Sequence, residues 1–216
     1  MKNKPKLLRF QKKILRSIGK YRKVFVTGPR GIGLTYGVLY SALRTAADNN
    51  GARVLIVAGH DYTIDAAVSH LTQISIEHNI PCYATLKRER RTGFANGSII
   101  YWKVYDKDRL LGMEDFDLIC FDAFSIAKER FALIAETLKL KLKFKKDSVS
   151  RRPTLLMSVN AGSFDIKDSD YINKRYILKE GDDPMIKVIK ASFWEHRYFS
   201  LWDKIRMFLG FSRKGL

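Results

Sequence analysis

A glycine-rich turn between an apolar strand and a helix constrains this chain more than any other feature. The stretch VFVTGPRGIGLTYG occupies residues 24–37. Its glycines let the backbone curl so that N–H groups face a phosphate, and the start of the helix adds a positive end. The pattern G-x-x-x-x-G-K-[ST] is complete except that Leu34 stands where the lysine belongs. We therefore expect a phosphate-binding turn without its lysine; the alternative is a glycine turn with no ligand.

Apolar runs alternate with amphipathic segments along most of the chain. Because buried strands that alternate with helices build a mostly parallel sheet covered on both faces, the sequence predicts an α/β fold. Ligands of such folds bind beyond the carboxyl ends of the strands. The predicted strands are residues 23–27, 52–58, 98–104 (an edge strand or hairpin arm opened by the turn Asn96-Gly97), 117–122, 153–159 and 188–194, and the predicted helices are residues 7–18, 33–47, 61–77, 128–142 and 202–211.

A second motif is the buried strand LICFD, which ends at Asp122. A carboxylate in this position commonly holds Mg²⁺, although it also caps the following turn in proteins without a metal. The next residue is Ala123, whose methyl group cannot accept a proton as a general base does. The sequence therefore predicts a metal site that is poorly equipped for hydrolysis.

The charge balance favours a polyanionic partner. The chain of 216 residues has 40 Lys and Arg against 22 Asp and Glu, a net charge of +18. No run approaches the roughly 20 apolar residues of a membrane span, so we expect no membrane partner. The two cysteines lack metal-binding spacing, and Cys120 is expected to be a small buried side chain.

Four segments in order resemble the ATPase domain of the phage large terminase subunit, a viral DNA-packaging motor. They are LRFQKKIL (residues 8–15), GPRGIGLT (28–35), the run from Gly93 to Phe124 with its NGS-x-I start, and LLMSVNAGS (155–163). The resemblance implies a P-loop NTPase fold of the RecA-like, ASCE type, with degenerate Walker A and Walker B motifs. Leu34 and Ala123 are the two departures.

The resemblance also implies a nucleotide site for ATP and Mg²⁺. Gln11 would read the adenine edge, Thr35 and Asp122 would hold the metal, Asn160 would couple hydrolysis to movement, and Arg30 would contribute a catalytic cation whose planar fork differs from a lysine. The expected nucleotide-binding residues are Gln11, Gly28, Pro29, Arg30, Gly31, Ile32, Gly33, Leu34 and Thr35.

Double-stranded DNA is the expected macromolecular partner. Candidate phosphate contacts lie in two basic groups, Lys87, Arg88, Arg90 and Arg91, and Lys143, Lys145 and Lys146. The first group is alternatively a solvated loop, or the source of an arginine for a neighbouring subunit. By resemblance, the chain would form a homo-oligomeric ring with portal and small terminase partners. It would act in the cytoplasm of an infected host cell and transiently at the procapsid.

We expect an ATPase-like core over residues 1–164 and a basic extension or subdomain over residues 165–216, with no room for a nuclease domain. Two functions remain open. One is a packaging-motor ATPase domain that binds ATP and duplex DNA with impaired hydrolysis. The other is a non-catalytic pseudo-ATPase that binds DNA or assembles with a motor. In either case, Leu34 and Ala123 stand where the family has lysine and glutamate, through natural or deliberate replacement.

Overall fold

The computed structural model describes residues 6–29, 31–58, 61–83, 90–104, 114–122, 143–144, 153–160, 182–192 and 194. The predicted helices at residues 128–142 and 202–211, and Ala123, lie outside these ranges.

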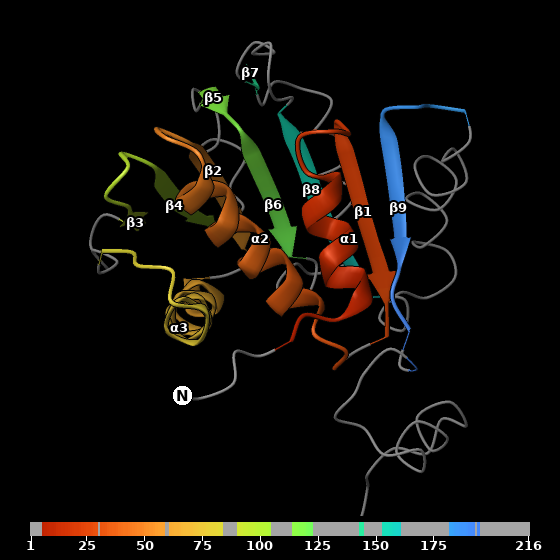
Figure 1. Cartoon of the computed structure of the whole chain (residues 1–216), viewed down its shortest axis with the longest axis horizontal. Coiled ribbons are helices and arrows are strands. Elements are labelled where there is room, and N and C mark those ends of the chain that lie inside the picture. Colours follow the sequence, from red (N-terminus) through yellow and green to blue (C-terminus); the bar gives the residue numbers. More distant parts are fainter. Residues whose placement is uncertain are drawn as a thin grey trace, which may run out of the picture.

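A seven-stranded sheet in the order β3-β4-β2-β6-β8-β1-β9 forms the centre of the protein. Every described pairing in it is parallel except that of β3 with β4 (Figure 1). This arrangement confirms the predicted mostly parallel sheet. The strands are β1 (Lys23–Gly28), β2 (Arg53–Ala58), β3 (Arg91–Gly93), β4 (Ile99–Val104), β6 (Leu118–Asp122), β8 (Thr154–Asn160) and β9 (Ile186–Lys190), and a separate two-stranded sheet pairs β5 (Glu114–Phe116) with β7 (Lys143–Phe144).

Three helices pack against one face of the large sheet, namely α1 (Arg9–Ser17), α2 (Leu34–Asp48) and α3 (Asp61–His78) (Figure 1). Their buried side chains form one apolar cluster with alternate residues of the strands, including Val24, Val54, Ile56 and Leu156. The intervening strand residues point to the opposite face and are also buried, as Phe25 and Phe121 are. Both faces are thus buried, which explains why these strands are continuous apolar runs.

The structure decides between the alternatives for β4 and moves the last strand. β4 is a hairpin arm, which confirms that alternative over the edge strand, because β3 pairs antiparallel with its outer side. The last strand is Ile186–Lys190 rather than residues 188–194, since it aligns with β1 from Lys23 onwards. β9 pairs with β1 in the large sheet, although it lies in the segment after residue 164, which was predicted to be an extension or subdomain.

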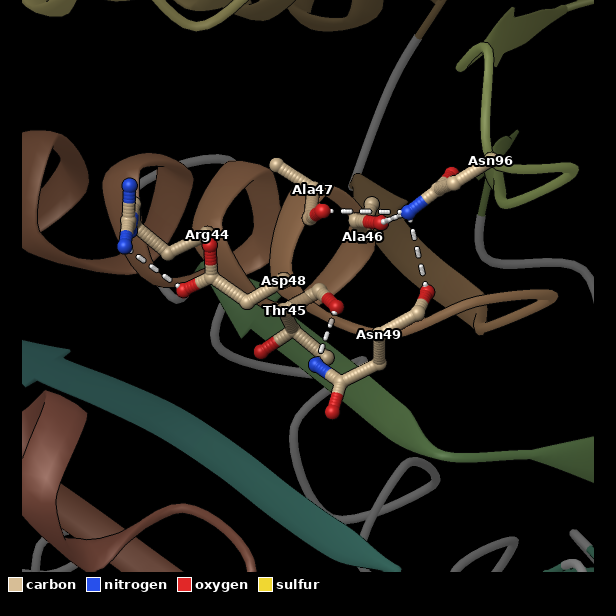
Figure 2. A network of polar contacts seen from close by, with 7 residues as sticks. All are labelled: Arg44, Thr45, Ala46, Ala47, Asp48, Asn49 and Asn96. Atoms are coloured by element: carbon tan, nitrogen blue, oxygen red, sulfur yellow. Dashed lines mark hydrogen bonds and ion pairs between the residues drawn. The ribbon is translucent and has the colours of Figure 1, made fainter.

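The Asn96-Gly97 turn that opens β4 holds the C-terminal end of α2 (Figure 2). The Asn96 side-chain amide donates hydrogen bonds to the carbonyls of Ala46, Ala47 and Asn49, over 2.8, 3.0 and 3.1 Å. Ser98 adds a hydrogen bond from its hydroxyl to the Asn49 carbonyl. Because the last carbonyls of a helix lack partners within it, these contacts give the NGS sequence a structural role.

None of the helices that the model describes is both long and apolar enough to cross a bilayer.

Candidate nucleotide site

The ends of three adjacent strands bring the predicted rim together. In the order β6-β8-β1, Asp122 aligns with Ser158, and Asn160 aligns with Gly28, where the glycine-rich turn begins. Gly28, Asp122 and Asn160 are 38 residues or more apart in the chain. Their backbones nevertheless lie at the carboxyl edge of neighbouring strands, towards which the arrowheads point in Figure 1. The side chains of Asp122 and Asn160 lie outside the described part of the structure.

Two glycines of the turn have left-handed backbone conformations. Gly31 and Gly33 have φ angles of 80° and 84°, a conformation that residues with a Cβ atom rarely adopt. Gly28 is required for space, because an added Cβ would lie 2.6 Å from Ile32 Cδ1 and 3.0 Å from the Ala191 carbonyl oxygen. The turn therefore needs glycine at these three positions for its path alone.

The N-terminal end of α2 has the electrostatic character of an anion site. Its N-cap, Gly33, makes no side-chain capping hydrogen bond, and the first turn holds no acidic residue. The first N–H groups of a helix have no partner within it, and the helix dipole adds partial positive charge there. The end of α2 thus presents backbone donors beside a curled glycine turn.

Leu34 is the first residue of α2 and belongs to the apolar core, with only 4% of its surface exposed. A lysine at this position would carry its ammonium towards a phosphate as a strongly hydrated point charge. The leucine instead buries its side chain. The turn keeps its backbone shape and contributes no side-chain cation at this position.

Gln11 from α1 is bonded to the glycine turn itself. Its Nε2 donates to the Gly33 carbonyl oxygen over 3.1 Å, and its Oε1 accepts a hydrogen bond from the Leu8 backbone N–H over 2.9 Å. The side chain is buried, and α1 approaches α2 closely at Gly37, where an added Cβ would lie 3.2 Å from Gln11 Cγ. Gln11 therefore fixes the position of the turn, and its predicted contact with adenine stays a prediction.

A cleft of about 380 Å³ opens beside the turn, between α2 and α3. The loop and α2 contribute Pro29, Gly31, Gly33, Leu34, Thr35, Tyr36 and Leu39, and α3 contributes His70, Gln73, Ile74 and Glu77. The contribution of α3 to this cleft was not predicted from the sequence. The i, i+3, i+7 spacing of its three polar residues was the available signal, because this spacing places them on one helix face.

The polar wall of this cleft is already hydrogen-bonded. The Glu77 carboxylate accepts hydrogen bonds from Gln73 Nε2 over 2.9 Å and from the Tyr36 hydroxyl over 3.2 Å. The same hydroxyl lies 2.7 Å from His78 Nε2. The cleft therefore has an apolar side formed by Leu34, Leu39 and Ile74 and a carboxylate side formed around Glu77.

Comparison with solved structures identifies the architecture. The large terminase of a thermophilic bacteriophage superposes with a TM-score of 0.69 at 14% identity, over 98% of this chain. The large terminase ATPase domain of a Thermus phage superposes with a TM-score of 0.60 at 16% identity, over 94% of this chain and 86% of its own. The chain has the fold of a large-terminase ATPase domain.

The likeness to terminases is one of fold. The HK97 bacteriophage large terminase also superposes, with a TM-score of 0.55 at 12% identity, over 87% of this chain and 40% of its own. The chain spans about half the length, 52%, of the thermophilic phage's large terminase. That protein has been solved with ADP and with ATP-gamma-S. No protein-family model matches the sequence, and no curated protein matches it.

The described residues also bear on the predicted metal site. No group of three or more His, Cys, Asp or Glu that could hold a metal occurs among the residues the model describes. Mg²⁺ typically takes one or two protein oxygens and completes its shell with water and phosphate. Thr35 lines the cleft beside the turn and Asp122 ends β6, and their predicted pairing as Mg²⁺ ligands stays a prediction.

Of the candidate DNA residues, Arg90, Arg91 and Lys143 lie in the described part of the structure. Arg90 and Arg91 belong to the β3 edge, five strand positions from β1, or about 24 Å at 4.8 Å per strand. They therefore do not reach a nucleotide on the turn of the same chain. Lys143 is in β7, aligned with Glu114 of β5. Arg30, Lys87, Arg88, Lys145 and Lys146 lie outside the described residues.

Proposed function

We propose that this chain is a viral DNA-packaging motor ATPase domain of the large-terminase type. It binds ATP and duplex DNA, and its hydrolysis is impaired. One observation carries the proposal: three strand ends meet beside a glycine turn that leads into an uncapped helix N-terminus. That is the position at which parallel α/β folds bind phosphates.

In this proposal the backbone of residues 28–35 cradles the phosphates, and Gln11 holds the turn in place through Gly33. Thr35 and Asp122 bind Mg²⁺, which neutralises phosphate charge when bound. Arg30 supplies a cation from within the turn. Asn160, whose backbone aligns with Gly28, senses the terminal phosphate from the neighbouring strand in this proposal.

Impaired hydrolysis follows from two residues. Leu34 provides no charge for the outer phosphates, and Ala123 provides no base for the attacking water. The missing charge and the missing base both slow ATP hydrolysis, the first at the phosphates and the second at the attacking water. We therefore expect weak nucleotide binding and little or no turnover by the unaltered chain.

The partners follow from the same proposal. Basic residues would contact duplex DNA without reading its sequence. Arg90 and Arg91 lie about 24 Å from the turn of their own chain, too far to contact a nucleotide there. In a homo-oligomeric ring, either arginine would instead contact the nucleotide of a neighbouring subunit. A portal protein and a small terminase subunit are the expected assembly partners. The site of action would be the infected host's cytoplasm and the procapsid.

A second candidate function is a non-catalytic pseudo-ATPase that binds DNA or assembles with active motor subunits. The burial of Leu34 in the apolar core favours it, because the side chain serves packing where the motor requires a charge. The two candidates differ in whether nucleotide still occupies the turn.

The test is ATP turnover, measured with and without DNA, for the unaltered chain and for the double variant Leu34→Lys, Ala123→Glu. We expect less than one turnover by the unaltered chain and DNA-stimulated turnover by the double variant. Repeated turnover by the unaltered chain would refute impaired hydrolysis. Absence of nucleotide binding in both proteins would refute the nucleotide site and leave the second candidate.

A further inference from the structure

A second cleft, of about 600 Å³, lies between α1 and the edge strand β9, apart from the nucleotide site. Five of its nine described lining residues are cationic: Lys13, Arg16, Lys20, Lys187 and Lys190. The other four are Ser17, Tyr21, Val188 and Ile189, so no carboxylate is among the described residues that line it. Such a concentration of one charge sign focuses the electrostatic field and attracts anions.

The folding of α1 against β9 creates this concentration. Lys13 and Arg16 are three residues apart, which places them on one side of α1, and Lys20 follows in the turn after the helix ends. Lys187 shares a face of β9 with Ile189, which packs in the core with Ile14 of α1. Lys190 lines the cleft from the end of the same strand.

Protection of the sheet edge explains only part of this pattern. Lysines on an edge strand discourage pairing with other chains, which accounts for Lys187 and Lys190. It does not account for Lys13 and Arg16 of α1 or for Lys20 in the turn that follows this helix. Like charges gathered around one cleft oppose each other, and an anionic ligand offsets that repulsion.

The cleft extends along β9 towards the rim of the sheet. Lys190 is aligned with Thr27, the residue before Gly28, so the groove reaches the rim on which the glycine turn lies.

We propose that the cleft between α1 and β9 binds the phosphate backbone of duplex DNA without sequence preference. The inference adds a DNA-contacting surface that the proposed function does not contain, since that function places DNA at residues 87–91 and 143–146. It rests on the proposed function only in the choice of duplex DNA as the anion. In this proposal DNA binds the cleft whether or not the glycine turn holds a nucleotide, so DNA binding is measured without nucleotide.

The experiment measures binding of a fluorescent duplex of about 30 base pairs by anisotropy over a range of salt concentrations. The cleft variant is Lys13→Gln, Arg16→Gln, Lys20→Gln. The control variant is Lys6→Gln, Lys12→Gln, Lys103→Gln, which removes the same charge from residues that do not line the cleft. A second cleft variant, Lys187→Gln, Lys190→Gln, serves if the first is poorly folded by circular dichroism.

We expect the cleft variant to bind DNA at least tenfold more weakly than the control variant. The slope of log affinity against log salt should fall by about 2–3, since each lost phosphate contact contributes about 0.9. Equal loss in the cleft and control variants would overturn the inference in favour of general surface charge. Unchanged DNA affinity in both cleft variants would also overturn the inference. The cleft would then bind another anion, such as an acidic protein.

Failure of this inference is distinguishable from failure of the proposed function. ADP binding by the cleft variant, measured separately, reports on the glycine turn alone. Cleft variants that bind both ADP and DNA like the unaltered chain would refute the cleft and leave the nucleotide site standing.

Discussion

The two ends of α2 are built in opposite ways. At its C-terminal end, three carbonyl groups accept hydrogen bonds from Asn96, and Ser98 adds a fourth contact (Figure 2). At its N-terminal end, Gly33 offers no side-chain cap and no acidic residue follows in the first turn. The closed end serves stability, whereas the open end leaves backbone donors for a ligand. We therefore expect substitutions at the C-terminal end to change stability, and substitutions at the N-terminal end to change the shape of the turn and the binding of a ligand.

The largest expected effect on stability is at the closed end. Asn96→Ala removes the donor of three hydrogen bonds, and we expect unfolding to become easier by about 2–3 kcal/mol. The melting temperature should fall by about 5–10 °C for a chain of this size. Asn50→Ala, at an exposed residue in the neighbouring turn, is the control and should change it little. Equal melting temperatures for the two variants would contradict the proposed role of Asn96.

At the open end, Gly33→Ala should cost about 1–2 kcal/mol, because alanine is strained at a φ of 84°. Its Cβ would also lie 3.2 Å from Gln11 Nε2. Gly31→Ala separates these causes, since Gly31 has a φ of 80° and nothing within 4 Å of an added Cβ. Chemical denaturation should show a greater loss for Gly33→Ala than for Gly31→Ala. The reverse order would show that the Gln11 contact with Gly33 is unimportant.

The smallest effect is expected on the exposed side of α2. Arg44 and Asp48 form an ion pair of 2.8 Å, with side chains 41% and 47% exposed. Arg44→Ala should therefore change the free energy of unfolding by about 0.5 kcal/mol or less. The difference should vanish at about 1 M salt, where charges are screened within about 3 Å. A loss above about 1 kcal/mol would show that this pair belongs with the stabilising contacts of the closed end.

Much of the fold was predictable because its strands are apolar runs. The predicted positions of β1, β2, β6 and β8 are confirmed within two residues, since burial on both faces marks them in the sequence. The short strands β3, β5 and β7 were not predicted. Two or three residues carry no hydrophobic period, and their pairing depends on neighbours that are distant in the chain.

The site was predictable where it depends on local chemistry. The glycine turn and the strand-end positions of Asp122 and Asn160 follow from the sequence around them. The bond between Gln11 and Gly33 was not predictable, because it joins residues 22 positions apart through the packing of α1 on α2. The same holds for the α3 wall of the cleft, which depends on how two helices lie against each other.

The central claim is that the turn before α2 is a phosphate site that lacks only the lysine charge at position 34. The decisive measurement is the dissociation constant for ADP by calorimetry, for the unaltered chain, Leu34→Lys and the uncharged control Leu34→Met. We expect weak binding, about 0.1–1 mM, for the unaltered chain and the control, and at least tenfold tighter binding for Leu34→Lys. Failure of folded Leu34→Lys to bind ADP more tightly than Leu34→Met would contradict the claim.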